Sequence, residues 1–250
     1  MHAMLRDATP PLTRSVEDYL KAIYHLSNQG GFAATSDIAA MLEVAPPSVS
    51  GMVKRLSETG LIEHVPYRGV QLTAQGRRAA LRMIRRHRML ELYLTQHLGY
   101  DWGGVHAEAE RLEHAVSDEL IERMASALGQ PLYDPHGDPI PTAAGDIEEA
   151  ALVSLGEAAV GMKLELRQVG TQDAARLRYF AEQGLTPGVL LSVTERQPFN
   201  GPTTIALVPS GDRRVVGRDL AQLLWCREVP VEGGEGRAEG GEGRYGSAAR

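Results

Sequence analysis

The chain reads Ser36-Asp37-Ile38-Ala39-Ala40-Met41-Leu42 and, after Glu43-Val44-Ala45, continues Pro46-Pro47-Ser48-Val49-Ser50-Gly51-Met52-Val53-Lys54-Arg55-Leu56. Ser36 is a good N-cap residue, and proline suits the first turn of a helix because the N–H groups there have no intrahelical partner. The apolar residues of the second segment recur at helical spacing and mark its buried face: Val49, Met52, Val53 and Leu56. The two segments predict a helix-turn-helix.

A β-hairpin is predicted directly downstream. After Gly60, residues 61–72 read as two short strands around the turn Tyr67-Arg68-Gly69. A helix-turn-helix followed by a hairpin is a winged helix, in which the second helix enters the major groove of DNA while the wing contacts the backbone or the minor groove. The candidate DNA-contacting residues are Pro47, Ser48, Ser50, Gly51, Lys54 and Arg68. Gly51 offers no side chain, which favours sparse base readout and a contribution from DNA shape.

The distribution of charge favours DNA over protein as the partner of this winged helix. The whole chain of 250 residues has a formal net charge of -6, but residues 1–88 carry +5 and residues 89–250 carry -11. A winged helix can also be a pure protein-interaction module, and the local positive charge argues against that alternative. A hydrophobic content of 43% suffices for one to three small domains with real cores.

The cellular compartment is predicted from what the sequence lacks. No apolar stretch is long enough to cross a membrane, and residues 1–9 lack the apolar run of a secretory signal. Cys226 is the single cysteine, so no internal disulfide can form. We therefore expect a cytoplasmic protein with no membrane partner.

Residues 106–114, His-Ala-Glu-Ala-Glu-Arg-Leu-Glu-His, place four donor side chains along one helix face: His106, Glu110, Glu113 and His114. One helix earlier, His87 and Glu91 repeat the four-residue spacing. These nitrogen and oxygen donors are typical of a metal site. The competing interpretation is a wet surface with weak ion pairs, which the spacing alone leaves open.

A first helix is predicted from residue 13 onward, with Val16, Leu20, Ile23 and Tyr24 facing a core. Asp18 lies three residues after Ser15. On residue physics alone, this spacing favours a carboxylate that completes a helix cap over a metal ligand.

Several segments, taken in order and at their spacing, resemble one known family over residues 14–141. They are Val16-Glu17-Asp18-Tyr19-Leu20, Pro47-Ser48-Val49-Ser50, Leu72-Thr73-Ala74-Gln75-Gly76, Arg86-His87-Arg88-Met89-Leu90-Glu91, residues 106–118, and Pro135-His136-Gly137-Asp138-Pro139-Ile140-Pro141. The chain thereby resembles the diphtheria toxin repressor and manganese transport regulator family of metal-activated bacterial repressors.

The resemblance implies two sets of metal ligands. The primary set is Asp18, Glu110, Glu113 and His114, and the ancillary set is His87, Glu91 and His106. Iron-type members place methionine and cysteine at positions 18 and 110, whereas manganese-type members place carboxylates there, as this chain does. Hard oxygen donors suit Mn2+ and Fe2+, and we expect Mn2+ first. Lys21 stands where manganese-type relatives carry another carboxylate, which argues against a two-metal manganese cluster.

The predicted fold is mainly α with small β elements, in four parts. Residues 1–78 form a winged helix-turn-helix domain and residues 79–145 a helical metal-binding and dimerisation domain. Residues 146–229 resemble a small SH3-like barrel of the ferrous-transport accessory (FeoA) type, and residues 230–250 are predicted to be disordered. Four prolines from Pro131 to Pro141 suggest a linker. Asp173 is a candidate further ligand, with a helix cap as the alternative.

We therefore expect a metal-activated, homodimeric repressor of metal-uptake genes that binds operator DNA and no small-molecule substrate. Metal would clamp Asp18 of the DNA-binding domain to the helical domain, which couples metal affinity to DNA affinity. The dimer helix is predicted from an apolar stripe whose alternative role is packing within one monomer: Val116, Leu120, Ile121, Met124 and Leu128.

Two competing functions are a di-metal enzyme and a regulator that does not depend on metal. A carboxylate-bridged di-metal enzyme needs Glu-x-x-His on two helices, whereas this chain offers one imperfect version, Glu110-x-x-Glu113-His114. The sequence also lacks His-Glu-x-x-His, a phosphate-binding glycine loop and a nucleophile elbow. The other alternative is a winged-helix regulator independent of metal, whose acidic and histidine face is a structural dimer surface.

Overall fold

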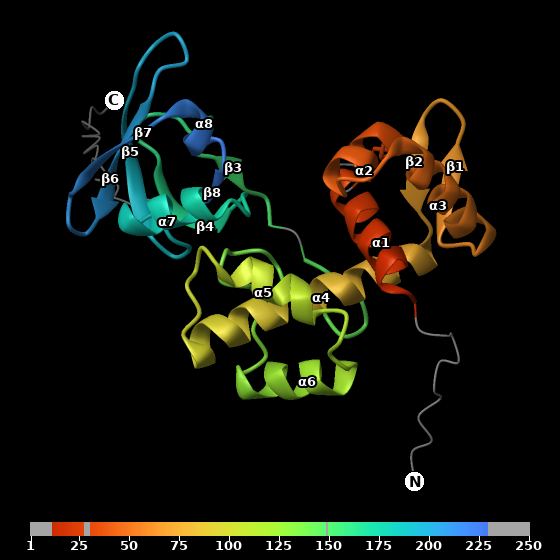
Figure 1. Cartoon of the computed structure of the whole chain (residues 1–250). Helices are drawn as coiled ribbons and strands as arrows, with labels where there is room; N and C mark the ends of the chain where they lie inside the picture. Colours follow the sequence, from red (N-terminus) through yellow and green to blue (C-terminus); the bar gives the residue numbers. More distant parts are fainter. Residues whose placement is uncertain (1–11, 28–30, 149, 230–250) are drawn as a thin grey trace, which may run out of the picture.

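The computed structural model describes residues 12–27, 31–148 and 150–229, and it arranges them in three units along the chain (Figure 1). A winged helix and a C-terminal β-sheet lie at opposite ends of a central helical unit. The residues predicted to lack a signal sequence, 1–9, and the predicted tail, 230–250, fall outside the described residues.

The winged helix forms as predicted. Helices α2 (Thr35–Met41) and α3 (Pro46–Glu58) make the helix-turn-helix, and strands β1 (Ile62–Val65) and β2 (Gly69–Leu72) pair antiparallel as the wing. The predicted cap at Ser36 is wrong by two residues. Helix α2 follows Ala34, which makes no side-chain cap, and the Ser36 hydroxyl donates to Asp37 instead.

Helix α1 (Arg14–Ser27) packs its predicted apolar face into the winged-helix core, where Leu20 and Ile23 are fully buried. The helix already includes Ser15, so a cap formed by Ser15 and Asp18 is wrong. Asp18 lies in the second turn, where one carboxylate oxygen lies 3.0 Å from His114 Nε2 and the other lies 4.0 Å from the Arg14 guanidinium.

A single long helix, α4 (Ala74–Leu98), connects the first two units. Thr73 caps it by accepting a hydrogen bond from the Gly76 N–H, and Gly99 ends it with φ +69°. Its first half packs in the winged-helix core through residues such as Leu81, and its second half packs in the helical core through residues such as Met89. The predicted boundary after residue 78 therefore lies inside one continuous helix.

Two shorter helices, α5 (Val105–Leu112) and α6 (Asp118–Ala127), flank α4 (Figure 1). Most of the apolar stripe predicted for dimerisation packs within the monomer. Ile121 is buried, and Val116, Met124 and Leu128 are partly buried against the same core. Leu120 remains 41% exposed.

The proline-rich segment predicted as a linker is packed instead. Ile140 belongs to the helical core, the Arg85 guanidinium donates to the Pro141 carbonyl at 2.8 Å, and Asp134 and His136 are buried. Proline and glycine specify turns in this segment, but they do not determine whether other elements of the fold pack against it.

The C-terminal unit is an antiparallel sheet in the order β3-β8-β4-β5-β6-β7, with β3 and β7 at its edges. Its elements are β3 (Val153–Ser154), β4 (Lys163–Val169), α7 (Ala174–Glu182), β5 (Leu190–Arg196), β6 (Thr203–Val208), β7 (Arg213–Val216), α8 (Arg218–Ala221) and β8 (Leu224–Glu228). The sheet docks on the proline-rich segment through a hydrogen bond from the Val169 N–H to the His136 carbonyl at 2.9 Å. Gly137, at φ +87°, is required there because a Cβ would lie 1.8 Å from the Arg167 carbonyl oxygen.

Among the described residues, no helix combines the length and the apolar character needed to cross a bilayer. Cys226 is a free thiol inside the C-terminal core, where burial raises its pKa to about 12. A thiol with that pKa is held in its unreactive protonated form.

Candidate metal centres and DNA-binding face

Asp18, Glu113 and His114 form a group that we call the interdomain cluster, because Asp18 comes from α1 and the other two directly follow α5. His114 Nε2 lies 3.0 Å from Asp18 Oδ1 and 3.5 Å from Glu113 Oε1. One donor atom from each residue lies within 4.8 Å of the others. These are three of the four predicted primary ligands.

The helix carrying the predicted ligands is shorter than expected. Helix α5 ends at Leu112, so Glu113 is its C-cap and His114 lies just beyond it. Glu113 keeps helical backbone angles and its N–H still donates to the Ala109 carbonyl, which preserves the direction of its side chain into the cluster. The predicted shared face is therefore made by a helix and its terminal turn together.

Glu110, the fourth predicted primary ligand, stands beside the cluster and not in it. Its side chain is 51% exposed and lies 3.7 Å from the Lys21 Nζ and 3.6 Å from the His106 Nε2. Lys21 also lies 2.6 Å from Glu113 Oε1. The lysine ammonium thus pairs with two of the four predicted ligands.

Glu17 supports His114 and was not identified from the sequence. Glu17 Oε2 lies 2.7 Å from His114 Nδ1, and its other oxygen lies 3.8 Å from the Arg86 guanidinium. A histidine that donates through one ring nitrogen to a carboxylate keeps the other nitrogen free and oriented for a metal. The only sequence signal for this role is the position of Glu17 immediately before a predicted ligand.

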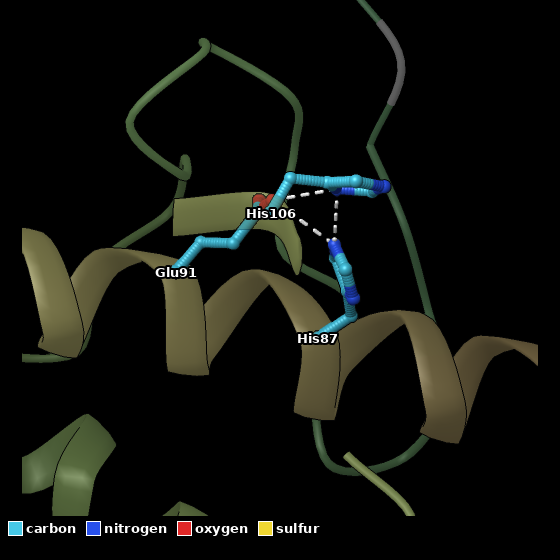
Figure 2. Close-up of side chains that lie close together, drawn as sticks. All are labelled: His87, Glu91 and His106. Carbon is cyan, nitrogen blue, oxygen red and sulfur yellow. Dashed lines mark hydrogen bonds and ion pairs between the residues drawn. The ribbon is translucent and has the colours of Figure 1, made fainter. Parts of the chain in front are cut away.

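The predicted ancillary ligands come together as the intradomain cluster: His87 and Glu91 from α4, with His106 from α5 (Figure 2). The Glu91 Oε1 atom lies 3.0 Å from both His87 Nε2 and His106 Nδ1, and the two ring nitrogens lie 2.9 Å apart. Figure 2 shows the three side chains converging between the two helices. Glu91 is completely buried.

Glu113 connects the two clusters, because its second oxygen, Oε2, lies 2.5 Å from His87 Nδ1. Burial alone would lower the pKa of His87, but its hydrogen bonds to Glu113 and Glu91 outweigh burial and raise the pKa to about 9. Burial alone would raise the pKa of Glu113, yet His87 and Lys21 hold it below its usual value. Without metal, the centre therefore consists of charged, mutually compensating groups.

A third group, the loop cluster, combines Glu91 with Asp134 and His136, all of them buried. Glu91 Oε2 and His136 Nδ1 lie 3.7 Å apart, and within the described part of the chain neither atom has a hydrogen-bond partner. Burial and the neighbouring charges of Asp138 and Glu91 raise the pKa of Asp134 to about 8. The sequence did not identify Asp134 and His136 as donors, because the prolines around them indicated a linker.

Asp173 lies apart from all three clusters. It is the N-cap of α7, where its side chain accepts a hydrogen bond from the Arg176 N–H at 2.8 Å, and it is exposed. Asp173 is therefore a helix cap, as the alternative interpretation of the sequence states, and it does not lie near the predicted metal ligands.

The residues present fit a divalent metal. The three clusters offer only carboxylate oxygens and imidazole nitrogens, which suit manganese and iron. Buried carboxylates and histidines without full hydrogen bonding are costly unless a further partner satisfies them. Glu91 and Glu113 are 0% and 1% exposed, so the alternative of a solvated, salt-bridged surface does not describe them.

The predicted DNA-contacting face is open to solvent. Pro47, Ser48, Ser50, Gly51, Lys54 and Arg68 are all exposed, whereas Val49, Val53 and Leu56 turn inward. An added Cβ at Gly51 would meet nothing within 4 Å. The Arg68 guanidinium, in the turn between β1 and β2, lies 4.5 Å from the centre of the Phe32 ring, and this cation–π contact orients its side chain.

A winged helix joined by one continuous helix to buried carboxylate and histidine clusters defines a metal-dependent DNA-binding regulator. Residues 11–70 match the model of the iron dependent repressor N-terminal DNA binding domain, residues 73–142 match the metal binding and dimerisation domain, and residues 153–228 match the FeoA domain. The chain belongs to the family of iron- and manganese-dependent transcriptional repressors that includes the diphtheria toxin repressor. The resemblance inferred from the sequence is confirmed.

Its relatives carry both metals in their names. The iron-dependent repressor of Mycobacterium leprae is 30% identical over 230 residues, which cover 87% of this chain and 99% of the relative. The diphtheria toxin repressor of Corynebacterium glutamicum is 32% identical, with 87% and 98% covered. A manganese-dependent transcriptional repressor solved with manganese superposes with a TM-score of 0.78 at 38% identity, covering 86% of this chain and all of that one. Family members are DNA-binding repressors and not enzymes, which excludes the di-metal enzyme alternative.

Proposed function

We propose that this chain is a cytoplasmic, homodimeric repressor that responds to Mn2+ in preference to Fe2+ and represses genes for metal uptake. Its primary ligands would be Asp18, Glu110, Glu113 and His114, and its ancillary ligands would be His87, Glu91 and His106. The observation that carries the proposal is the origin of the interdomain cluster, whose donors come from α1 on one side and from α5 on the other.

The preference for manganese rests on the donor set. Carboxylates at positions 18 and 110 are hard donors, and no sulfur ligand favours a softer metal. Solved relatives named as manganese-dependent repressor and as manganese regulator support the same choice at 38% and 32% identity. Relatives named as iron-dependent repressors keep Fe2+ as the second candidate.

The coupling follows from where the side chains lie. Helix α1 packs into the winged-helix core through Leu20 while Asp18, on the same helix, meets His114 at 3.0 Å. A divalent cation among these donors would supply the charge that holds the carboxylates together. Glu17 would keep His114 oriented toward Asp18, so the position of α1 relative to α4 becomes linked to occupancy of the cluster.

Linkage makes this coupling reciprocal, so DNA binding should raise metal affinity by the same factor as metal raises DNA affinity. In a homodimer, the spacing of the two α3 helices has to match successive major grooves, which makes DNA binding sensitive to the position of α1. The partly exposed helix α6, with Leu120 on its surface, is the proposed site of dimer contacts.

The test is DNA binding to the chain's own promoter and to metal-transporter promoters, titrated with Mn2+, with Fe2+ under anaerobic conditions, and with chelator. Asp18→Asn should raise the Mn2+ concentration needed for binding by on the order of a hundredfold, because it removes a charged donor. Asp212→Asn, at an exposed position between β6 and β7, is the matched control. If neither chelator nor Asp18→Asn changes DNA binding, the protein would be a winged-helix regulator that does not depend on metal.

A further inference from the structure

We propose that Lys21 is a built-in counter-cation of the interdomain cluster, which a divalent metal must displace from Glu113, and that it sets the metal concentration at which the protein responds. The inference rests on the proposed function, since it assumes that the cluster binds metal. It concerns a residue that is not itself a metal ligand.

The contacts of Lys21 place its charge where a metal would bind. Its Nζ lies 2.6 Å from Glu113 Oε1, and that same oxygen lies 3.5 Å from His114 Nε2. The lysine therefore occupies the oxygen that Glu113 directs toward the other donors. The second oxygen of Glu113 lies 2.5 Å from His87 Nδ1, so both Glu113 oxygens already have a partner when Lys21 is in place.

The surroundings of Lys21 strengthen its ion pair with Glu113, for which a metal would have to compete. Glu113 is 1% exposed and the Lys21 side chain is 18% exposed, so this ion pair is largely shielded from water. Glu110, at 3.7 Å, adds a second carboxylate to the same ammonium. A single positive charge thus neutralises part of an acidic site whose residues could otherwise repel one another.

A divalent metal and an ammonium at the same oxygen are both positively charged. They therefore repel each other strongly in a site that is shielded from water. Binding of metal must also break the ion pair of Lys21 with Glu113. Both effects have the same sign, so Lys21 weakens metal binding. A neutral side chain of similar length at position 21 should therefore strengthen it.

Lys21 also has a structural effect in the metal-free protein. It lies on α1, and Glu113 ends α5, so their ion pair joins the DNA-binding and helical units over 92 positions of sequence. Removing Lys21 should lower the stability of the metal-free protein while it raises metal affinity. A residue that only held the two units together would weaken both properties when removed.

The first test compares wild type, Lys21→Met and Lys163→Met by calorimetric titration of the full chain with MnCl2 at one pH and ionic strength. Lys163 is exposed on β4, so Lys163→Met controls for the loss of one lysine charge. Lys21→Met should bind Mn2+ about tenfold or more tightly, and its melting temperature in chelator should fall. Lys163→Met should match wild type in both.

The outcomes separate this inference from the proposed function. Wild type that binds no Mn2+ would overturn the proposed function, whereas wild type that binds Mn2+ with Lys21→Met equal or weaker would overturn only the role of Lys21. If Lys21→Met does not fold, Lys21→Gln keeps a hydrogen-bond donor without the charge and carries the same expectation. Lys21→Arg keeps the charge and should stay within about threefold of wild type.

A second test follows the displaced side chain itself. The chain contains three lysines, Lys21, Lys54 and Lys163, so amine-reactive labelling can be assigned by mass spectrometry. Saturating Mn2+ should raise the labelling rate of Lys21 about threefold or more relative to chelator and leave Lys163 unchanged. An unchanged or slower rate at Lys21 would show that the ammonium keeps its place when metal binds, and would overturn the proposal.

Discussion

The interdomain and intradomain clusters use the same kinds of donor, yet the first connects two units of the fold and the second lies within one unit. Asp18 of the interdomain cluster meets His114 across 96 positions of sequence and across two units of the fold, and its side chain is 34% exposed. All residues of the intradomain cluster come from the packed pair α4 and α5, with Glu91 completely buried. Under the proposed function, a metal in the first cluster would connect two units of the fold, whereas a metal in the second would lie within one unit.

Glu113 links the two settings, because one of its oxygens faces Lys21 and the other faces His87. Glu113 is therefore in contact with residues of both clusters. Substitution of Glu113 should affect both clusters. Substitution of a residue that belongs to only one cluster should affect that cluster more than the other.

The largest effect is expected for Glu113→Gln. The amide keeps the shape but leaves the Lys21 and His87 charges without their buried partner, which should cost about 3 kcal/mol of unfolding free energy in chelator and abolish the DNA response to metal. Denaturant unfolding measures the first effect. Glu110→Gln, at a half-exposed position, should cost less than about 1 kcal/mol. Equal costs would mean that the burial of Glu113 has no energetic consequence.

The metal-free protein should lose stability as the pH rises from about 6.5 through about 9. The pKa of His87 is raised to about 9 by Glu113 and Glu91 against the effect of burial, so its stabilising charge is fully present below the unfolded value of 6.5 and is lost above the folded one. The loss should approach about 3 kcal/mol. Asp134, with a pKa raised to about 8 by burial, acts in the same direction.

Chemical unfolding in chelator at pH 6, 7.5 and 9 measures this slope. His87→Gln should reduce it, since the amide does not titrate and only the contribution of Asp134 is left. An undiminished slope in His87→Gln would assign the pH dependence to other groups and remove the coupling between the clusters.

His114→Ala and His106→Ala compare the two clusters directly. Loss of His114 removes a donor from the joint, so the Mn2+ needed for DNA binding should rise by on the order of a hundredfold. Loss of His106 removes a donor from the helical unit alone, and the rise should stay below about tenfold. Mobility-shift titrations measure both, and equal effects would show that the intradomain cluster controls DNA binding as much as the joint does.

The smallest effect is expected for Glu17→Gln. The amide can still accept a hydrogen bond from His114 but loses the charge that orients and strengthens the ring, so Mn2+ affinity should fall about tenfold. Glu195→Gln, at an exposed position of β5, is the control and should leave affinity unchanged. Calorimetry with MnCl2 measures both, and unaltered affinity in Glu17→Gln would make Glu17 a simple ion-pair partner of Arg86.

Much of the fold could be predicted because its signals are local. The apolar spacing of Val49, Val53 and Leu56 requires one buried helix face, and that face is the one observed. The hairpin at residues 61–72 follows from turn residues between short apolar runs, and its register places Ile62 opposite Leu72. The ends of helices were less accurate, as at α2 and α5, because capping depends on only one or two residues.

The donor types and their helical spacing were determined by the sequence alone, and so was membership of the repressor family. The tertiary structure decided which donors meet: it brings Asp18 to His114, leaves Glu110 at the edge and adds Glu17 and Lys21 from α1. Periodicity fixes directions within one helix, but contacts over more than 90 residues depend on how α1 docks on α4 and α5. Burial of Asp134 and His136 was likewise decided by packing of the proline-rich segment against α4 and the C-terminal sheet, which no local pattern specifies.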